Sequence, residues 1–312
     1  MVRLFGLLVV ASVAYTPVRR RMSCPAAVDV RMRRVSLHAM SPDARDGAGA
    51  VGALLRYPIK GFPADSLESV TVEANGTFPS DRLYAVVDAT DDGGWDAARP
   101  RWVHKQHFFG AFRSRDVLAS LNTSCRAGVL AFDGGPETGL SARLDTAAGR
   151  ATVEAAIAAR VQSPQVRLVT GGEGHQFGNT RSGVKSHGDT RTIHLVNAAS
   201  VAAVRAATGL DVDASVFRPN VVLEGLDAWA EEAWVGKQLR LGGALLEVIS
   251  RTVRCDAINM HPRTGARWPG NRDLVAEIAG NFPAVGPYLG VYARVLRGGT
   301  VSLNDDAAVI AS

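Results

Sequence analysis

Short apolar segments separated by glycine turns constrain the fold of this 312-residue chain more than any other feature. Residues 238–241 and 245–249 flank Gly242-Gly243, a pair that favours a tight β-hairpin turn. A second pair, Gly298-Gly299, separates two further apolar segments and predicts another hairpin. Many short strands and few helices indicate a β-barrel or a curled sheet. We therefore expect a β-rich α+β fold.

A polar, glycine-rich stretch divides the chain into two β-rich regions. Residues 171–188 contain six glycines and predict a long loop, which is usually functional in a compact domain. Before it, the apolar run 82–88 predicts a buried strand, and turn residues within 126–150 predict hairpins. After it, Asn197 is a suitable N-cap for a helix over 198–208. In chain order we expect a leader, an N-terminal β domain, the loop, a C-terminal β domain and a tail, at residues 1–48, 49–170, 171–188, 189–306 and 307–312.

The positive charge of the chain is concentrated in its first 40 residues. This segment has seven arginines and one acid, Asp29, so its net charge is 7 − 1 = +6. The whole chain has a net charge of +5, which leaves 5 − 6 = −1 for the remainder. The basic character therefore belongs to the leader, and it gives no reason to expect that the body binds nucleic acid.

The leader has the character of a targeting segment. Arg3 precedes the apolar run 4–14, which is too short to span a bilayer, so we expect no transmembrane helix in the mature chain. An arginine-rich, acid-poor tract follows. This combination, and the sequence Ala-Ser-Val-Ala-Tyr at 11–15, resembles the bipartite plastid leaders of algae with secondary plastids. A mitochondrial presequence and an unstructured N-terminus are the alternatives.

Cys255 is the first candidate for a chemically active residue. Arg251 and Arg254 precede it, and nearby positive charge favours the thiolate, which is a nucleophile and a soft metal ligand. The alternative is a cysteine packed in a β core without reactivity. The chain has only three cysteines, too few for a disulfide framework, although a bond between Cys125 and Cys255 stays open.

A second polar cluster, Arg218-Pro219-Asn220, interrupts an apolar run that predicts a strand over 216–223. Residues two apart on a strand face the same side, so Arg218 and Asn220 are expected to project together. A guanidinium in apolar surroundings needs an anion. The alternatives are a phosphate or pterin ligand, or a structural ion pair with Asp189 or Glu224. Lys60 and Arg82 also adjoin apolar strands, and Arg82 has Asp81 as a possible surface partner.

Taken in order, these motifs resemble the MOSC family, the molybdenum cofactor sulfurase C-terminal domain, preceded by its N-terminal β-barrel partner. The resemblance covers roughly residues 50–306 and rests on the following segments: Tyr57-Pro58-Ile59-Lys60, Asp81-Arg82, Phe217-Arg218-Pro219-Asn220, Trp234-Val235-Gly236-Lys237, Arg254-Cys255 and Gly290-Val291-Tyr292-Ala293. It implies a MOSC-type β-barrel after a smaller β-barrel-like domain. The mitochondrial amidoxime-reducing component is a more distant resemblance.

The resemblance also implies a site for the molybdenum cofactor. Cys255 matches the cysteine that binds molybdenum in the amidoxime-reducing enzymes. The positions that match residues holding the pterin and phosphate are Lys60, Arg82, Asp189, Thr190, Arg218 and Asn220. The donor types agree with this assignment, because thiolates suit a soft metal centre and guanidinium groups suit phosphate.

Three departures from the reductase pattern affect the expected activity. Gly61 stands where reductases usually have serine, and Arg191 stands where they have a small hydroxyl residue. The segment 256–262 lacks the threonines that usually follow the cysteine. The first expected function is reduction of small N-hydroxylated or N-oxide compounds with electrons from a separate protein. The second is sulfur transfer by a Cys255 persulfide without redox turnover, and the third alternative is a MOSC scaffold that binds neither cofactor nor sulfur.

Two other cofactor systems have no support in the sequence. No cysteine-rich ferredoxin-like tail follows the domain, which is why a reductase would need an external electron donor. Pyridoxal phosphate is associated with the family through a fused aminotransferase-like domain, and nothing in this sequence independently indicates it.

Overall fold

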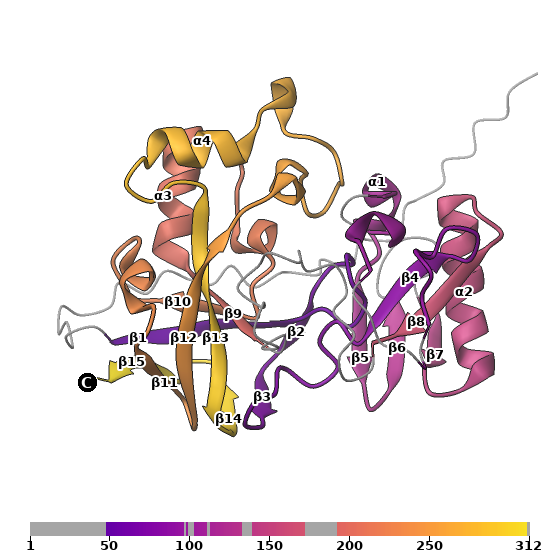
Figure 1. The fold of residues 1–312 in the computed structure, drawn as a ribbon, viewed down its shortest axis with the longest axis horizontal. Helices are drawn as coiled ribbons and strands as arrows, with labels where there is room; N and C mark the ends of the chain where they lie inside the picture. The colour runs from indigo at the N-terminus through magenta and orange to yellow at the C-terminus, as the bar shows by residue number, and fades with distance from the viewer. Residues whose placement is uncertain are drawn as a thin grey trace, which may run out of the picture. The chain divides into compact units, whose positions relative to one another are not determined.

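The computed structural model describes residues 48–96, 98, 103–110, 113–132, 139–171 and 192–310. Figure 1 shows these residues as two groups of strands with few helices. The strands are β1 Ala48–Arg56, β2 Asp65–Leu67, β3 Ser69–Val72, β4 Tyr84–Asp88, β5 Thr123–Arg126, β6 Val129–Phe132, β7 Ser141–Arg143, β8 Val166–Thr170, β9 Ile193–Asn197, β10 Val221–Glu224, β11 Gln238–Leu241, β12 Ala244–Val253, β13 Tyr288–Arg297, β14 Gly299–Ser302 and β15 Asp306–Ile310. The α-helices are α1 Arg115–Leu118, α2 Ala147–Val161, α3 Ala198–Thr208 and α4 Leu274–Asn281. Short 3₁₀ turns are η1 Lys105–His107, η3 Ala214–Phe217, η4 Ala230–Trp234, η5 Asp256–Asn259 and η6 Pro269–Asn271.

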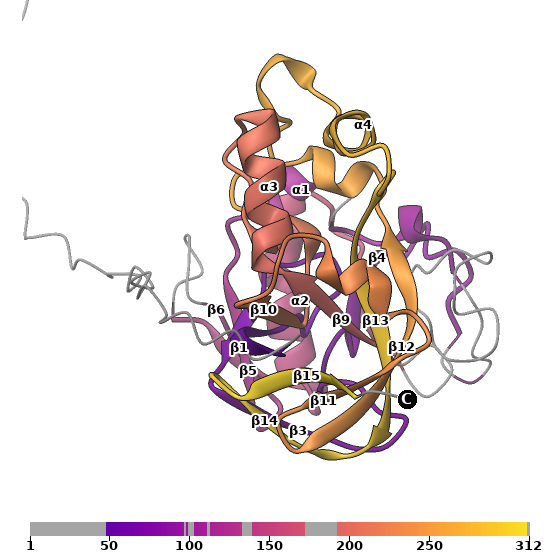
Figure 2. The same cartoon turned by 90° about the vertical axis from the view of Figure 1, so that its left-hand side faces the viewer.

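Seven strands close into a barrel. Their order is β10-β9-β13-β12-β11-β15-β1, and a further pairing between β1 and β10 completes the ring. Figure 2 shows these strands curling around a shared interior. Inward-facing side chains alternate along β12, so every second residue of this strand is buried. The expected β-barrel is confirmed, and β1, the first described strand, closes it by pairing with β10.

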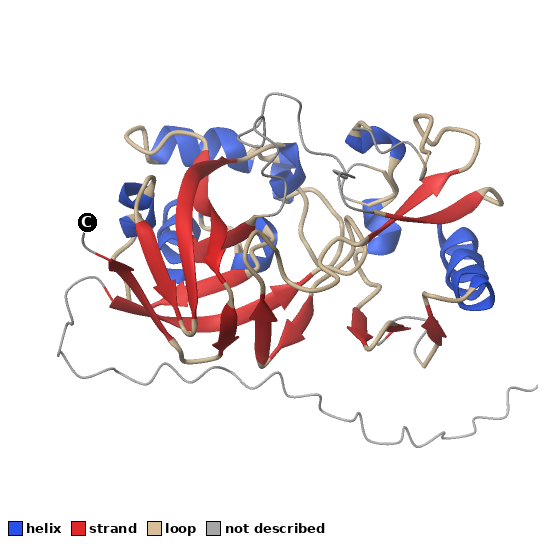
Figure 3. Ribbon diagram, turned by 60° about the horizontal axis from the view of Figure 1, so that its bottom comes forward, coloured by secondary structure: helices blue, strands red, loops and turns tan. Residues whose placement is uncertain are grey.

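The first part of the body has its own small sheets and core. Strands β4 and β8 pair antiparallel, and β5, β6 and β7 form a three-stranded sheet. Helix α2 packs on this region through buried residues that include Val153 and Ile157. Figure 3 shows these short strands and α2 as a group of their own. The β-rich α+β class expected from the sequence is confirmed.

Helices α3 and α4 lie at one end of the barrel (Figure 1). Helix α3 begins after Asn197, whose side chain accepts a hydrogen bond from the Ala199 amide, and it ends at Gly209 in a left-handed conformation. Both ends of α3 therefore agree with the sequence prediction. The hairpin of β11 and β12 around Gly242-Gly243 is also confirmed.

The second predicted hairpin is wrong, because β14 pairs with β3 and not with β13. The glycines instead permit two close chain contacts. A Cβ atom at Gly298 would lie 2.6 Å from the carbonyl oxygen of Val72, and one at Gly299 would lie 2.3 Å from Gly243. Gly298-Gly299 is thus needed where the chain passes between other strands, and not for a two-residue turn.

The strand predicted over residues 216–223 begins later than expected. Residues Ala214–Phe217 form a 3₁₀ turn, Arg218 is left-handed with φ 56° and ψ 51°, and β10 starts at Val221. Pro219 explains the delay, because proline has no N–H for a strand ladder. Arg218 and Asn220 therefore do not lie on one strand face, and the expectation that they project together for that reason is wrong.

The expected C-terminal tail at residues 307–312 also needs correction. Strand β15 includes residues 306–310 and pairs with both β11 and β1. The apolar residues 307–310 are consecutive and show no alternation, so a strand of this length gives little periodic signal. Residues 1–47 and most of the glycine-rich loop lie outside the described residues.

Asn220, the residue before β10, connects β9 with β1. Its backbone N–H donates to His194, and its carbonyl accepts from the Leu55 amide, at 2.8 Å each. Its side chain repeats the bridge, since Oδ1 accepts from the His194 amide and Nδ2 donates to the Leu55 carbonyl, at 3.2 Å each. Asn220 is buried, so these four bonds hold β9 and β1 on either side of β10.

We predict that Asn220→Ala lowers the free energy of unfolding by about 1–3 kcal/mol, because a buried N–H and a buried carbonyl lose their partner. Urea unfolding followed by circular dichroism measures this change. The matched control is Asn281→Ala, at the exposed end of α4, which should leave the midpoint unchanged. Equal midpoints for both variants would show that the side-chain bridge does not stabilise the barrel.

Candidate functional site

Barrel closure places Tyr57 against Arg218. Leu54 pairs with Val221 in the antiparallel β1–β10 ladder, and continuing this register by three residues brings Tyr57 opposite Arg218. The Arg218 guanidinium carbon lies 4.2 Å from the centroid of the Tyr57 ring, and that of Arg82 lies 4.6 Å from it. The ring of Tyr57 is therefore a platform that holds two cations.

Backbone carbonyls fix the neighbouring guanidinium groups. Arg82 Nη2 donates to the carbonyl of Arg218 at 3.2 Å, and Arg254 Nη2 donates to the carbonyl of Phe217 at 3.0 Å. Asp81 forms an ion pair with Arg82, and it also accepts from the Tyr57 amide at 2.8 Å. The sequence suggested a weak surface pair for Asp81 and Arg82, but the Asp81 side chain is only 4% exposed. This carboxylate thus orients the platform and one of its cations.

Positive charge exceeds negative charge in this cluster. Burial and then the repulsion of Arg82 and Arg115 lower the pKa of Arg218 to about 10, while interaction with Tyr57 acts in the opposite direction. Among the described residues, no carboxylate lies within ion-pair distance of Arg218, so the expected alternative of a pair with Glu224 is wrong. Its other expected partner, Asp189, lies outside the described residues.

Several buried donors of the cluster have no acceptor in the described part of the chain. They are Tyr57 Oη, Arg218 Nη2 and Arg254 Nε. Buried polar groups are nearly always hydrogen-bonded, and an unpaired donor carries a cost in free energy. Three such donors beside uncompensated guanidinium charge fit an anionic ligand with several acceptor oxygens.

Cys255 directly follows Arg254 and begins the 3₁₀ turn η5. The thiol is free and exposed, and its residue is extended with φ −128° and ψ 173°. Cys125 is also free, so the bond between Cys125 and Cys255 left open by the sequence is absent. The exposed thiol therefore adjoins the cation cluster through Arg254.

Arg115 from helix α1 supports the turn that follows Cys255. Its Nη1 donates to the carbonyl of Ala257 at 2.6 Å and its Nη2 to the carbonyl of Met260 at 3.1 Å. Burial lowers the pKa of Arg115, and attraction to Cys255 opposes this effect. Arg115 is only 8% exposed, so it brings a buried positive charge from the first part of the chain to the Cys255 turn.

Arg251 does not have the role that its position in the sequence indicated. It pairs with Glu232, donates to the carbonyl of Val285, and lies 4.1 Å from the ring centroid of Tyr288. Its charge is therefore used in a structural contact. Arg254 and Arg115 are the cations with an electrostatic interaction with Cys255.

The other predicted site residues are placed less directly. Lys60 follows a bridge between Ile59 and Tyr84, and its Nζ lies 5.6 Å from the ring centroid of Phe108. The structure thus places its ammonium group over Phe108 and not over Tyr57. Asn220 adjoins the cluster through its barrel bridge. Asp189 and Thr190 lie outside the described residues.

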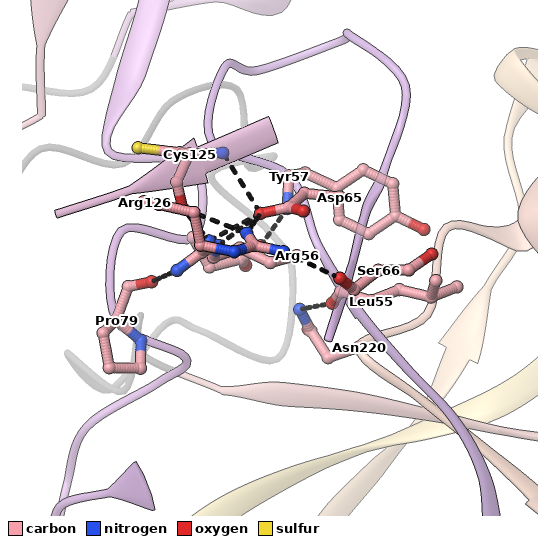
Figure 4. Close-up of polar contacts among 10 residues, drawn as sticks. Leu55, Arg56, Tyr57, Asp65, Ser66, Pro79, Cys125, Arg126 and Asn220 are labelled. Atoms are coloured by element: carbon pink, nitrogen blue, oxygen red, sulfur yellow. Dashed lines mark hydrogen bonds and ion pairs between the residues drawn. The ribbon is translucent and has the colours of Figure 1, made fainter. Parts of the chain in front are cut away.

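A separate network of ion pairs and hydrogen bonds surrounds Asp65. Arg56 and Arg126 each approach Asp65 Oδ2 to 2.5 Å, and the Cys125 amide donates to the same oxygen at 3.2 Å (Figure 4). Burial raises the pKa of the Cys125 thiol, with Arg56 acting in the opposite direction. Figure 4 also shows the Tyr57 hydroxyl at the far end of its ring from Asp65. This network is therefore a structural support of β1, and Cys125 is part of it.

Sequence reasoning missed three contributors to the site. Tyr57 was noted only as part of a motif, Arg254 only as a neighbour of the thiol, and Arg115 not at all. An aromatic residue at the end of a strand and an arginine before a cysteine were available signals. Arg115 had none, because its contact with residues 257–260 spans more than 140 positions in sequence.

Comparison with known families agrees with these elements. The MOSC N-terminal beta barrel domain matches residues 48–164, and the MOSC domain matches residues 182–308. Together they cover most of the chain, including the barrel and the arginine cluster. The chain belongs to the MOSC family.

Two curated relatives show similarity over shorter segments. Mitochondrial amidoxime-reducing component 1 from Homo sapiens is 31% identical over 80 residues, which are 26% of this chain and 23% of that protein. Molybdenum cofactor sulfurase from Drosophila mojavensis is 32% identical over 95 residues, which are 30% of this chain and 12% of that protein. The chain thus spans less than a quarter of the length of either relative.

Among solved structures, the YUAD protein from Bacillus subtilis aligns with 84% of this chain and 95% of its own, at 11% identity and a TM-score of 0.38. At this TM-score the fold assignment rests on the strand pairings given above. In the part of the chain that the structure describes, no helix has the length and apolar character needed to cross a membrane. The described residues also contain no group of three or more His, Cys, Asp or Glu side chains suited to a metal ion.

We predict that Arg115→Gln loosens the turn after Cys255, because two carbonyls lose a charged donor. Such bonds contribute about 1.5–3 kcal/mol, so hydrogen exchange in the peptide 255–260 should accelerate about tenfold or more. Exchange measured by mass spectrometry tests this. Arg113→Gln is the control, since Arg113 pairs with Asp88 and stacks on Phe109. An unchanged exchange rate in Arg115→Gln would show that Arg115 does not support the turn after Cys255.

Proposed function

We propose that this protein binds the molybdenum cofactor at the Tyr57 platform, with Cys255 as the protein ligand of molybdenum. The observation that carries the proposal is a group of buried donors, Tyr57 Oη, Arg218 Nη2 and Arg254 Nε, that find no acceptor among the described residues and lie beside an exposed free thiol. A phosphorylated pterin with a sulfur-bound metal needs both features, namely guanidinium donors for oxygen and a thiolate for the metal. The residues present therefore fit the cofactor.

Each residue has a defined task in this proposal. Arg82, Arg218 and Arg254 bind and orient the anionic part of the cofactor, because their guanidinium groups already lie on one platform. Lys60 adds a further cation from the loop after β1. Asn220 keeps Arg218 in place by fixing the start of β10 between its neighbours.

We further propose an oxidoreductase that reduces small N-hydroxylated or N-oxide compounds. The cofactor supplies the two-electron chemistry, and a separate electron-transfer protein supplies the electrons. The similarity to mitochondrial amidoxime-reducing component 1 supports this substrate class, and the surplus of positive charge supports retention of an anionic cofactor during turnover. Asp189 and Thr190 remain proposed contributors to the same pocket.

A sulfur-transfer protein is the second candidate function. Cys255 is exposed and could exchange sulfur with another protein without a conformational change, and two of the matched relatives are molybdenum cofactor sulfurases. In this case Cys255 would carry a persulfide, and the arginine cluster would bind the cofactor that receives the sulfur. Persulfide on Cys255 in protein without molybdenum would favour this function.

We also propose that residues 1–48 direct the protein to a plastid or a mitochondrion, on the basis of the arginine-rich, acid-poor composition of this segment. A fluorescent protein fused behind this segment tests the proposal in cells that contain both organelles. Diffuse fluorescence throughout the cell would contradict it.

The metal content of protein purified from a cofactor-competent host tests the lead proposal. We predict close to one molybdenum atom per chain in the native protein, since a tight site retains its metal during purification. Arg218→Gln should retain less than about a tenth of this amount, because a bond to a charged group contributes about 1.5–3 kcal/mol and several act together here. Inductively coupled plasma mass spectrometry gives the ratio.

Arg143→Gln is the matched control, because Arg143 is exposed and pairs with Asp145 in the sheet of β5, β6 and β7. It should retain the native amount of molybdenum. Native protein with less than about a tenth of an atom per chain would rule out the lead proposal. Cys255→Ser separates the two functions: metal loss supports ligation, and unchanged metal with loss of persulfide supports sulfur transfer.

A further inference from the structure

The hydroxyl of Tyr57 is a buried polar group that makes no hydrogen bond to any described residue. Tyr57 is 1% exposed, and its oxygen has no hydrogen-bond partner within the described residues. A buried hydroxyl without a partner destabilises a protein, and a phenylalanine would avoid this cost. A tyrosine at this position therefore indicates that the hydroxyl has a partner beyond the residues that the structure describes.

The surroundings of this hydroxyl define what the partner can be. Arg82 and Arg218 stack on the ring of Tyr57. The backbone amide of Tyr57 donates a hydrogen bond to Asp81. Arg254 interacts electrostatically with Tyr57 as well. The network around Asp65 does not reach the hydroxyl, which Figure 4 shows at the opposite end of the ring. Arg218 and Arg82 act on the phenol more strongly than the carboxylates of Asp81 and Asp213, so its missing partner fits an acceptor better than a donor.

The phenol is in its neutral, donating form. Burial raises the pKa of Tyr57 to about 12, although Arg218 and Arg82 act to lower it. At neutral pH the hydroxyl therefore keeps its proton and can donate it in a hydrogen bond. Arg218 Nη2 and Arg254 Nε are further donors of the same cluster for which the described part of the chain offers no acceptor.

We propose that the Tyr57 hydroxyl donates a hydrogen bond directly to an oxyanion of the phosphate class bound between Arg218 and Arg254. This inference rests on the proposed function, because it assigns an anionic ligand to the same cluster. Tyr57 then acts twice, with its ring face holding two guanidinium groups and its hydroxyl contacting the ligand that they attract. The hydroxyl adds one donor at a fixed position beside the guanidinium groups, and this donor can bond an acceptor oxygen of the ligand.

The experiment uses the full chain purified from a host that cannot make the cofactor, with inorganic phosphate as the probe. Isothermal titration calorimetry at constant ionic strength gives the dissociation constant. We expect Tyr57→Phe to raise this constant tenfold or more, since a hydrogen bond to a charged group is lost while the ring remains. Tyr84→Phe is the control in a neighbouring buried tyrosine, and it should bind phosphate as the native chain does.

The melting temperature without phosphate distinguishes a ligand contact from a structural role of the hydroxyl, because the two roles predict opposite changes in Tyr57→Phe. If the hydroxyl serves only the ligand, Tyr57→Phe melts at the same temperature as the native chain or higher, because an unpaired buried group has been removed. A lower melting temperature would show that the hydroxyl is bonded within the fold and would overturn the inference. Equal phosphate binding by Tyr57→Phe and the native chain, or no binding by the native chain, would overturn it too.

These outcomes are separate from the test of the proposed function. Weaker phosphate binding by Tyr57→Phe in a protein that never retains molybdenum would support the hydroxyl contact and reject the molybdenum proposal. Native molybdenum content with equal phosphate binding by both chains would do the reverse.

Discussion

The pairing of β1 with β10 is the constraint on which the site depends. This ladder closes the barrel, and its register determines which residue after β1 meets which residue before β10. An irregularity between Val51 and Ala53 shifts the register by one residue, and only the shifted register brings Tyr57 opposite Arg218. A one-residue slip reverses the faces of a strand. The bulge in β1 is thus as important for the site as the residues that line it.

The site brings several arginines close together, and two of them have an unusual backbone conformation. Arg82 and Arg218 both have positive φ, at 50° and 56°, which is uncommon for residues with a side chain. Such conformations cost about 1–3 kcal/mol each and are found where function requires them. Here they direct two guanidinium groups onto one ring. Burial and then the nearby Arg254 lower the pKa of His194 well below its usual value, so this histidine adds no further charge.

The sequence predicted the class of fold and several elements well. Helix α3 was predicted because its cap residue Asn197 acts locally, and the β11–β12 hairpin because a glycine pair encodes its turn. The β14 pairing was mispredicted, since its glycines serve contacts with strands far away in sequence. Local patterns therefore identified the elements, but not all of their partners.

The same distinction holds for the site. Arg82, Arg218 and Cys255 were predicted from motifs, and the structure brings the two arginines onto one platform with Cys255 beside the cluster. The reason given for Arg218, a shared strand face with Asn220, was wrong, because Pro219 delays the strand. Arg115 was not predicted, since only the folded chain brings α1 to the turn after Cys255. Charge balance and unpaired donors become visible only when these distant residues are placed together.

The central claim is that Cys255 and the arginine cluster form one cofactor site in which the thiolate binds molybdenum. X-ray absorption at the molybdenum edge tests this most directly, because it counts the sulfur neighbours of the metal. The account predicts that Cys255→Ser, reconstituted with the cofactor, has one sulfur neighbour fewer than the native protein. An identical number of sulfur neighbours in both proteins would contradict it.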